Sequence, residues 1–287
     1  MSGLKNEIAD FLQDAGFTTA FQKINGIDLI NVACNGRIRS IIPICPTAGS
    51  ADEAIHQQAG HLKVIDIVKK DMNYPLIVSE DRWRRQCGAI KERLLAHLEI
   101  FFPIYARNCE IRRIEKDEAA GFLKENHSYA DAACRYRYGM FIKRHTGHIL
   151  RERDICLEPG TLVAVATFSN ARRWIKGDKV IKSYEWTRYA SLTGTRICGG
   201  MGKMLETFIK EVEPDDIMTY ADLEWSEGGA YEQLGFKLEG QKEAVTFIID
   251  PHTWERRPVK QGDNQEAGLY YCNFGSNKYR LKLTDYD

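Results

Sequence analysis

Hydrophobic and polar positions follow two different periods along the chain, and these periods predict its elements. Apolar residues recur every three or four positions in some segments, which is typical of helices with one buried face. Elsewhere they alternate or form short continuous runs bounded by turn residues, which indicates strands. The expected helices are 4–15, 51–70, 80–98, 116–125, a segment starting near 201, and 227–234. The expected strands are 16–33, 37–44, 75–79, 109–114, 136–142, 162–169, 182–189, 216–221, 236–240, 244–250 and 279–283.

The order of these elements predicts two domains of the α/β class. Segments up to residue 98 give a helix, two strands joined at the Asn35-Gly36 turn, a helix, a strand and a helix. The pattern changes near Phe101-Phe102-Pro103, so we expect a smaller α/β domain at 1–100. The remainder, 101–287, is expected to form a mixed sheet flanked by helices (α+β). A chain of 287 residues is long enough for both.

Composition excludes several classes. No run of about 18 apolar residues is present, so no membrane-spanning helix is expected. Acidic residues in the first turns argue against a secretory signal. The 8 cysteines include no CxxC pair, which favours reduced thiols in the cytoplasm over a disulfide framework or a zinc site.

The net charge is zero, but the charges are segregated along the chain. Between residues 135 and 203 there are 14 Lys and Arg against 5 Asp and Glu, whereas 206–243 holds 3 against 11. The basic segment 135–203 is therefore a candidate surface for phosphates, either of a cofactor or of double-stranded DNA. Alternatively, the two segments neutralise each other in the fold.

The sequence around residue 200 predicts a phosphate-binding turn. A strand leads into Cys198-Gly199-Gly200-Met201-Gly202-Lys203 and then into a helix. Backbone N–H groups at such a helix start can hold a pyrophosphate, and glycines allow its close approach. The alternative is a tight turn that only packs a helix onto a sheet.

This turn and a downstream segment, Tyr-Glu-Gln-Leu-Gly-Phe at 231–236, together resemble the acyl-CoA N-acyltransferase (GNAT) superfamily. The resemblance implies that acetyl-CoA or another acyl-CoA is the donor and that the glycine turn binds its pyrophosphate. The basic position of the family pattern falls on Ile197, and the adjacent Arg196 supplies the charge instead. The resemblance also implies that Tyr231 protonates the departing thiolate.

Residues 103–285 are also similar to the Mom-like C-terminal domains of phage homing endonuclease-type proteins. Mom proteins modify adenine in DNA and are built on a GNAT-like fold. The similarity runs through NHSYADAACRYRYGMF, LVAVATFSNAR and TYADLEWSEGGAYEQLGF. It implies a shared site that includes His127, Arg172, Arg188, Asp222 and Tyr231, and it makes a bound metal near His127 and Asp222 conceivable. Each of these residues also has a structural alternative: a turn, a cap, an ion pair or a core tyrosine.

Residues 59–94 resemble the latter part of a very-short-patch-repair-type endonuclease domain, a restriction-endonuclease-like fold. The upstream catalytic aspartate of that family has no clear equivalent, and Ala33 stands where an acidic residue is expected. A metal-dependent nuclease needs clustered carboxylates, and Asp28 alone does not supply them. We therefore expect a degenerate nuclease-like domain.

Three functions remain open. The first is a GNAT-fold transferase that uses an acyl-CoA or related donor and acts on an amine, with DNA bases as one acceptor. The second is a small-molecule or protein N-acetyltransferase. The third is a non-catalytic, DNA-binding remnant of a homing endonuclease-type protein. For the first, the expected catalytic residues are Tyr231, Asp222, His127 and Arg188.

Overall fold

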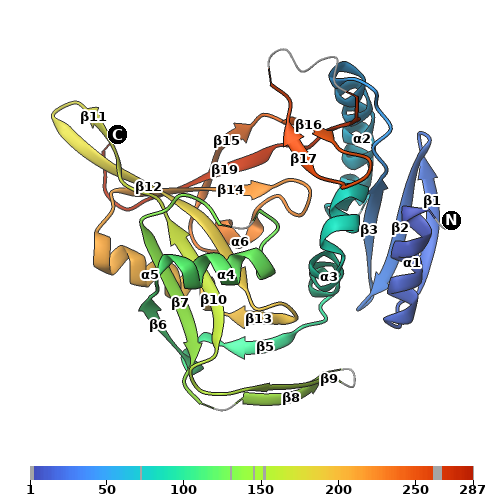
Figure 1. The fold of residues 1–287 in the computed structure, drawn as a ribbon. Coiled ribbons are helices and arrows are strands. Elements are labelled where there is room, and N and C mark those ends of the chain that lie inside the picture. Colours follow the sequence, from blue (N-terminus) through green and yellow to red (C-terminus); the bar gives the residue numbers. More distant parts are fainter. Residues whose placement is uncertain are drawn as a thin grey trace. The chain divides into compact units, whose positions relative to one another are not determined.

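A computed structural model describes residues 3–71, 73–129, 131–144, 146–150, 153–260 and 267–286. The chain divides into two compact units, each built from several segments. Unit 1 comprises Met1–Ile90, Ala221–Gly229 and Gly240–Lys278. Unit 2 comprises Lys91–Tyr220, Ala230–Glu239 and Tyr279–Asp287. The 1–100 and 101–287 domains expected from the sequence differ from these units in three segments: 91–100 falls in unit 2, and 221–229 and 240–278 fall in unit 1. Figure 1 traces the elements of both units.

Unit 1 contains a four-stranded sheet in the order β1-β2-β3-β4, in which β1 to β3 are antiparallel and β4 runs parallel to β3. The single strand expected at 16–33 is wrong, because a turn at Asn25-Gly26 splits it. Both turn residues have positive φ, at 49° and 83°, as a tight hairpin requires. The elements are α1 (Leu4–Asp14), β1 (Thr19–Ile24), β2 (Ile27–Cys34), β3 (Arg37–Ile44), α2 (Ala51–Asp71), β4 (Leu76–Ser79) and α3 (Glu80–His97).

A second, three-stranded sheet in the order β17-β16-β18 completes unit 1. Its strands are β16 (Thr246–Ile249), β17 (Arg256–Pro258) and β18 (Leu269–Cys272). Val64 and Val68 of α2 share one buried cluster with Ile249, Tyr271 and Phe274. Segments far apart in sequence therefore build this core together, which explains why 240–278 belongs with the N-terminal residues.

Unit 2 is organised around a mixed sheet in the order β15-β19-β14-β12-β10-β7-β6, with β11 paired to β12. Helices α4 and α5 pack on strands of this sheet (Figure 1). The mixed α/β class expected from the sequence is confirmed. The elements are β5 (Phe102–Tyr105), η1 (Ala106–Asn108), β6 (Cys109–Arg113), α4 (Lys116–Asn126), β7 (Tyr136–Ile142), β8 (Thr146–Leu150), β9 (Arg153–Leu157), β10 (Leu162–Phe168), β11 (Arg172–Lys176), β12 (Lys179–Ser191), β13 (Thr195–Cys198), α5 (Gly200–Val212), β14 (Asp216–Asp222), α6 (Gly229–Glu232), β15 (Lys237–Lys242) and β19 (Ser276–Lys282).

Aromatic packing fixes α5 on this sheet. Phe208 of α5 is fully buried and stacks on Phe168 of β10, with ring centroids 3.9 Å apart and nearly parallel planes. The rings of Tyr136, Tyr138 and Tyr184 approach Phe208 edge-on, at 5.4 to 6.3 Å. The start of α5 is consequently held at a defined position next to β12.

Candidate active site

The predicted glycine turn forms the junction between β13 and α5. Gly199 adopts a left-handed conformation with φ 76°, and no side chain caps the helix. The first intrahelical donor is Lys203, whose N–H bonds to Gly199 O at 3.1 Å. Among the described residues, no acceptor pairs with the backbone N–H groups of Gly200, Met201 or Gly202. These donors and the positive end of the helix dipole meet at one point, which is suited to an anion.

Close packing around residue 200 leaves no room for a side chain there. A Cβ at this position would lie 2.7 Å from Ile197 Cγ2 and 2.9 Å from the hydroxyl oxygen of Tyr189. A Cβ at Gly202 would meet only Leu234 Cδ2, at 3.4 Å. The turn is thus pressed against β12 at Gly200 and is more open at Gly202.

The charged residues of the turn have different surroundings. Arg196 is exposed, and its guanidinium lies 4.8 Å from the centre of the Phe101 ring. The Lys203 ammonium instead donates to two backbone carbonyls, Ala106 O at 2.9 Å and Cys109 O at 2.6 Å. Cys198 is half-buried at the end of β13. Of the two cations, only Arg196 extends into solvent beside the helix start.

Strand β12 has an open edge next to this turn. β12 runs parallel to β14 only from Ser183 to Glu185, and no described strand pairs with that edge further on. On the opposite edge, Leu192 N–H donates to Val163 O, on the side of β10. The two-residue period of a strand therefore directs the backbone N–H groups of Tyr189 and Ser191 away from β10.

A chain of aromatic contacts connects the turn to Tyr231. Trp186 of β12 meets Tyr189 edge-on at 6.0 Å and Tyr231 at 6.1 Å, and Tyr231 also packs on Phe236 and Tyr279. Burial raises the pKa of Tyr231, although a hydrogen bond with Thr219 and the charges of Arg93 and Arg188 act against that shift. Burial likewise raises the pKa of Tyr189. Both phenols are therefore protonated at neutral pH.

The loop that follows α4 lies beside Arg188. The Arg188 guanidinium is 5.9 Å from the centre of the Tyr129 ring, and Arg93 donates to the Ser128 hydroxyl at 2.9 Å. Tyr129 N–H donates to His127 Nδ1 at 3.1 Å. A neutral His127 therefore carries its proton on Nε2 and is suited to donate a hydrogen bond rather than accept a proton.

Asp222 and Arg172, the two remaining predicted residues, have ion-pair contacts of their own. Asp222 belongs to unit 1, where its carboxylate is 3.6 Å from Arg82. Arg172 is exposed on β11, and its closest ion-pair contact is Glu185 at 3.9 Å. In the described part of the chain, no group of three or more His, Cys, Asp or Glu side chains is arranged to hold a metal ion. Nor does any described helix have the length and apolar character needed to span a membrane.

Sequence reasoning missed Tyr189, Trp186, Thr219 and Arg93. Tyr189 and Trp186 lie on the same predicted strand as Arg188, and membership of that strand was the only sequence signal that could have placed them in the site. Arg93 lies on a helix assigned to the other domain, and its proximity to Tyr231 has no local signature.

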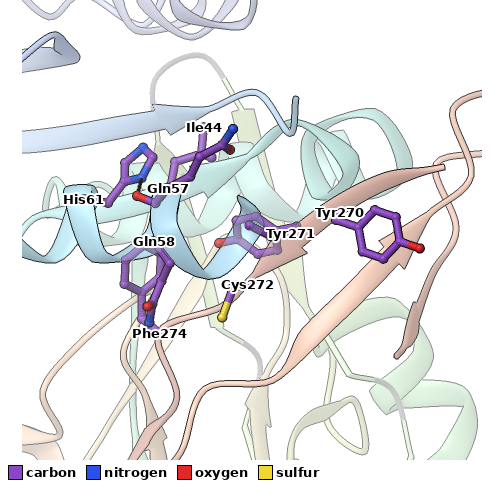
Figure 2. Close-up of a pocket in the computed structure, with 9 residues that line it drawn as sticks. Ile44, Gln57, Gln58, His61, Tyr270, Tyr271, Cys272 and Phe274 are labelled. Atoms are coloured by element: carbon purple, nitrogen blue, oxygen red, sulfur yellow. Dashed lines mark hydrogen bonds between the residues drawn. The ribbon is translucent and has the colours of Figure 1, made fainter. Parts of the chain in front are cut away.

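Unit 1 has a small pocket of its own between α2 and β18 (Figure 2). His61 Nδ1 lies 2.8 Å from Gln57 O, Gln58 donates to Asn273 O at 3.0 Å, and burial lowers the pKa of His61. The volume open to the centre of a water molecule is about 10 Å³. That is room for about one water, not for a substrate.

No family model and no curated protein matches the chain. Several solved acetyltransferases are similar to part of it. YncA of Salmonella typhimurium, solved with acetyl-CoA, is 14% identical, covers 62% of this chain and 95% of its own, and gives a TM-score of 0.34. The ribosomal-protein-S5-alanine acetyltransferase of Vibrio fischeri is 12% identical over 63% of this chain and 96% of its own, with a TM-score of 0.35. An N-acetyltransferase of Staphylococcus aureus Mu50 is 13% identical, covers 62% of this chain and 99% of its own, and gives a TM-score of 0.32. Likeness at this level assigns neither family nor substrate, so the functional argument rests on the geometry of unit 2.

Proposed function

We propose that unit 2 is a GNAT-type N-acyltransferase that moves an acyl group from acyl-CoA to an amine. The observation that carries this proposal is the adjacency of two unpaired sets of backbone donors. One set is the N-terminus of α5, and the other is the edge of β12 beyond Glu185. The contact between Tyr189 and Gly200 places them next to each other.

In this proposal, the helix start binds the pyrophosphate of the donor. The N–H groups of Gly200, Met201 and Gly202 donate to phosphate oxygens, and the exposed guanidinium of Arg196 adds positive charge. Lys203 positions α5 through its two carbonyl contacts rather than by reaching the phosphate. Gly199 and Cys198 form the turn that leads into the helix.

The open edge of β12 then holds the extended arm of the donor as an added strand would be held. The N–H groups of Tyr189 and Ser191 donate to carbonyl oxygens of that arm. When bound, acyl-CoA supplies a thioester carbon that an amine can attack. A backbone N–H of β12 aimed at the thioester oxygen stabilises the negative charge that develops there.

Tyr231 acts as the general acid in the proposed reaction. The acceptor nitrogen forms a bond to the acyl carbon, the carbon–sulfur bond breaks, and the phenol proton of Tyr231 passes to the departing sulfur. The raised pKa of Tyr231 keeps this proton available at neutral pH. The phenolate then takes up a proton from the acceptor side, directly or through water, which restores the starting state.

Arg188 and His127 orient the acceptor. The Arg188 charge acts on Tyr231, and the His127 ring can donate from Nε2 to an acceptor oxygen. The role of Asp222 in orienting or deprotonating the acceptor stays a prediction from the sequence. Within unit 1 its carboxylate lies 3.6 Å from Arg82 and accepts from Glu224 N–H at 3.0 Å. The acceptor is an amine of a DNA base, a protein or a small molecule, and the basic segment 135–203 favours the DNA base.

The test is thermal unfolding with acetyl-CoA, CoA and ATP, each added alone. A donor site predicts that acetyl-CoA and CoA stabilise the protein by about 2.7 kcal/mol at 100 times their Kd, while ATP at the same concentration has a smaller effect. Replacing Arg196 by Gln should weaken the CoA effect. Absence of any CoA effect on the wild-type protein, together with stabilisation by DNA, would favour the non-catalytic DNA-binding alternative.

A further inference from the structure

Strand β11 pairs with the first residues of β12, and the two extend from the unit 2 sheet as a two-stranded ribbon (Figure 1). The register pairs Arg173 with Lys182, Ile175 with Val180, and Lys176 with Lys179 across the ribbon. A short turn at Gly177-Asp178 closes it, with φ 58° at Gly177. All five residues of β11 are exposed.

The ribbon places like charges opposite each other. Arg173 faces Lys182, and Lys176 faces Lys179, although directly opposed like charges destabilise a strand pair. Among the described residues, neither Arg173 nor Lys182 has an ion-pair partner, and Asp178 is the only acid within the ribbon hairpin. A polyanion bound against Arg173 and Lys182 would reduce the repulsion between these two side chains.

The two faces of the ribbon differ. On one face, Trp174 packs edge-on against Tyr286 at 5.4 Å, and the Lys176 ammonium lies 5.8 Å from the same ring. On the other face, Ile175 is 76% exposed and Val180 57% exposed, and the two are cross-strand partners. Arg173 and Lys182 lie on this second face, because alternate residues of a strand share a face. The open face is therefore an apolar pair next to a pair of cations.

We propose that this open face binds duplex nucleic acid, with the ribbon entering the major groove. The major groove admits a two-stranded ribbon. Arg173 and Lys182 would contact phosphates, while Ile175 and Val180 would lie against apolar base edges such as thymine methyl groups. This inference deepens the proposed function, because it assigns DNA as the macromolecule presented to unit 2, and it is tested independently of acyl transfer.

The test is fluorescence anisotropy of a labelled 20-base-pair duplex titrated with the full chain at several salt concentrations. The double variant Arg173→Gln/Lys182→Gln should lose affinity and reduce the slope of log K against log salt by about 2, since each phosphate contact contributes about 0.9. The matched control is Lys116→Gln/Lys124→Gln, which removes the same charge from exposed positions of α4. Its slope should stay near the wild-type value.

Two further measurements test the apolar contacts in the major groove and the independence of duplex binding from donor binding. Ile175→Ser/Val180→Ser should weaken duplex binding without changing the salt slope, because it removes apolar contacts only. The CoA-induced thermal shift should be unchanged in every ribbon variant, which separates failure of this inference from failure of the transferase proposal. Equal salt slopes for the Arg173/Lys182 variant and the wild type, or binding of single-stranded DNA and heparin as tight as duplex, would overturn the inference.

Discussion

The ammonium nitrogen of Lys203 donates a hydrogen bond to the carbonyl oxygen of Cys109 at 2.6 Å. A second bond, to Ala106 O at 2.9 Å, ties the first turn of α5 to the start of η1. Hydrogen bonds from a charged donor contribute about 1.5–3 kcal/mol when the acceptor is otherwise removed from water. Lys203, which the sequence suggests as a phosphate ligand, therefore stabilises the contact between α5 and the segment 106–109.

Replacing Lys203 by Met should lower the free energy of unfolding by about 2–3 kcal/mol, because two carbonyls lose their charged donor. Chemical denaturation measures this change. Lys210→Met, at an exposed position later in the same helix, is the control and should change stability by under about 0.5 kcal/mol. If Lys203→Met kept full stability but lost the thermal shift caused by CoA, the lysine would be a direct phosphate ligand.

Gly200→Ala should damage both folding and donor binding. The added Cβ would clash with Ile197 and with the Tyr189 hydroxyl, at 2.7 and 2.9 Å, and relief of the clash would move the helix start away from β12. Overpacking of this kind costs about 1–3 kcal/mol, and thermal unfolding with and without acetyl-CoA measures both effects.

Gly202→Ala is the matched control, because its Cβ would meet only Leu234 Cδ2 at 3.4 Å. This variant should fold with near wild-type stability. Equal losses of stability in the two alanine variants would contradict the close contact assigned to Gly200.

The sequence predicted the helices and most of the buried strands of both units, because each carries its own period. It missed the strands β18 (Leu269–Cys272) and β5 (Phe102–Tyr105). The hairpin at Asn25-Gly26 was missed because apolar residues continue on both sides of it, although the Asn-Gly pair was available as a signal. Local sequence patterns could not predict how the segments of the chain divide between the two units. Segment 240–278 joins unit 1 through packing of Ile249 and Tyr271 on α2, and no property of those residues alone specifies that partner.

The candidate site shows the same limit. The glycine turn and Tyr231 carry recognisable motifs, and the structure gives each a defined setting. The relationship between them depends on Trp186, which meets Tyr189 and Tyr231 from a strand with no chemical motif of its own. The point at which β12 separates from β14 is set by the pairing and register of the two strands. Single residues do not encode that register.

Tyr231→Phe should reduce kcat for acyl transfer by about 10²–10⁴-fold with little change in the KM of the donor, since only the proton donor is lost. The dependence of the rate on pH tests the same role. Burial raises the pKa of Tyr231, so the wild-type acid stays protonated through pH 10 and its rate falls only above that raised pKa. The variant should lack that alkaline limb.

Tyr279→Phe is the control for Tyr231, because its ring packs on Tyr231 at 5.9 Å while its hydroxyl donates to Glu232 at 3.1 Å. It should keep the alkaline limb. Retention of the limb in Tyr231→Phe would transfer the role of general acid to another group, with Tyr189 the first to test.

A buried ion pair in unit 1 supplies the final prediction. Arg82 Nη1 lies 2.6 Å from Glu224 Oε2, the two side chains are 7% and 1% exposed, and Tyr271 donates to Glu224 Oε1 at 2.6 Å. Replacing Arg82 by Met leaves the buried Glu224 and the half-buried Asp222 without the Arg82 cation. Loss of one partner from such a pair costs about 3–5 kcal/mol. Chemical denaturation of Arg82→Met at pH 7 should show this loss.

The pH dependence and a second substitution distinguish charge from packing. Burial already raises the pKa of Glu224, and removal of Arg82 raises it further, because Arg82 is the largest influence in the opposite direction. A carboxyl with a raised folded-state pKa favours the folded state below its unfolded value of 4.5 and loses that contribution as the pH rises. Arg82→Met should therefore be least destabilised below pH 4.5 and increasingly destabilised as the pH rises above it. The double variant Arg82→Met/Glu224→Gln should recover stability at pH 7, since no buried carboxylate of Glu224 remains. An equal deficit in the single and double variants at all pH values would mean that Arg82 stabilises unit 1 through the packing of its side chain alone.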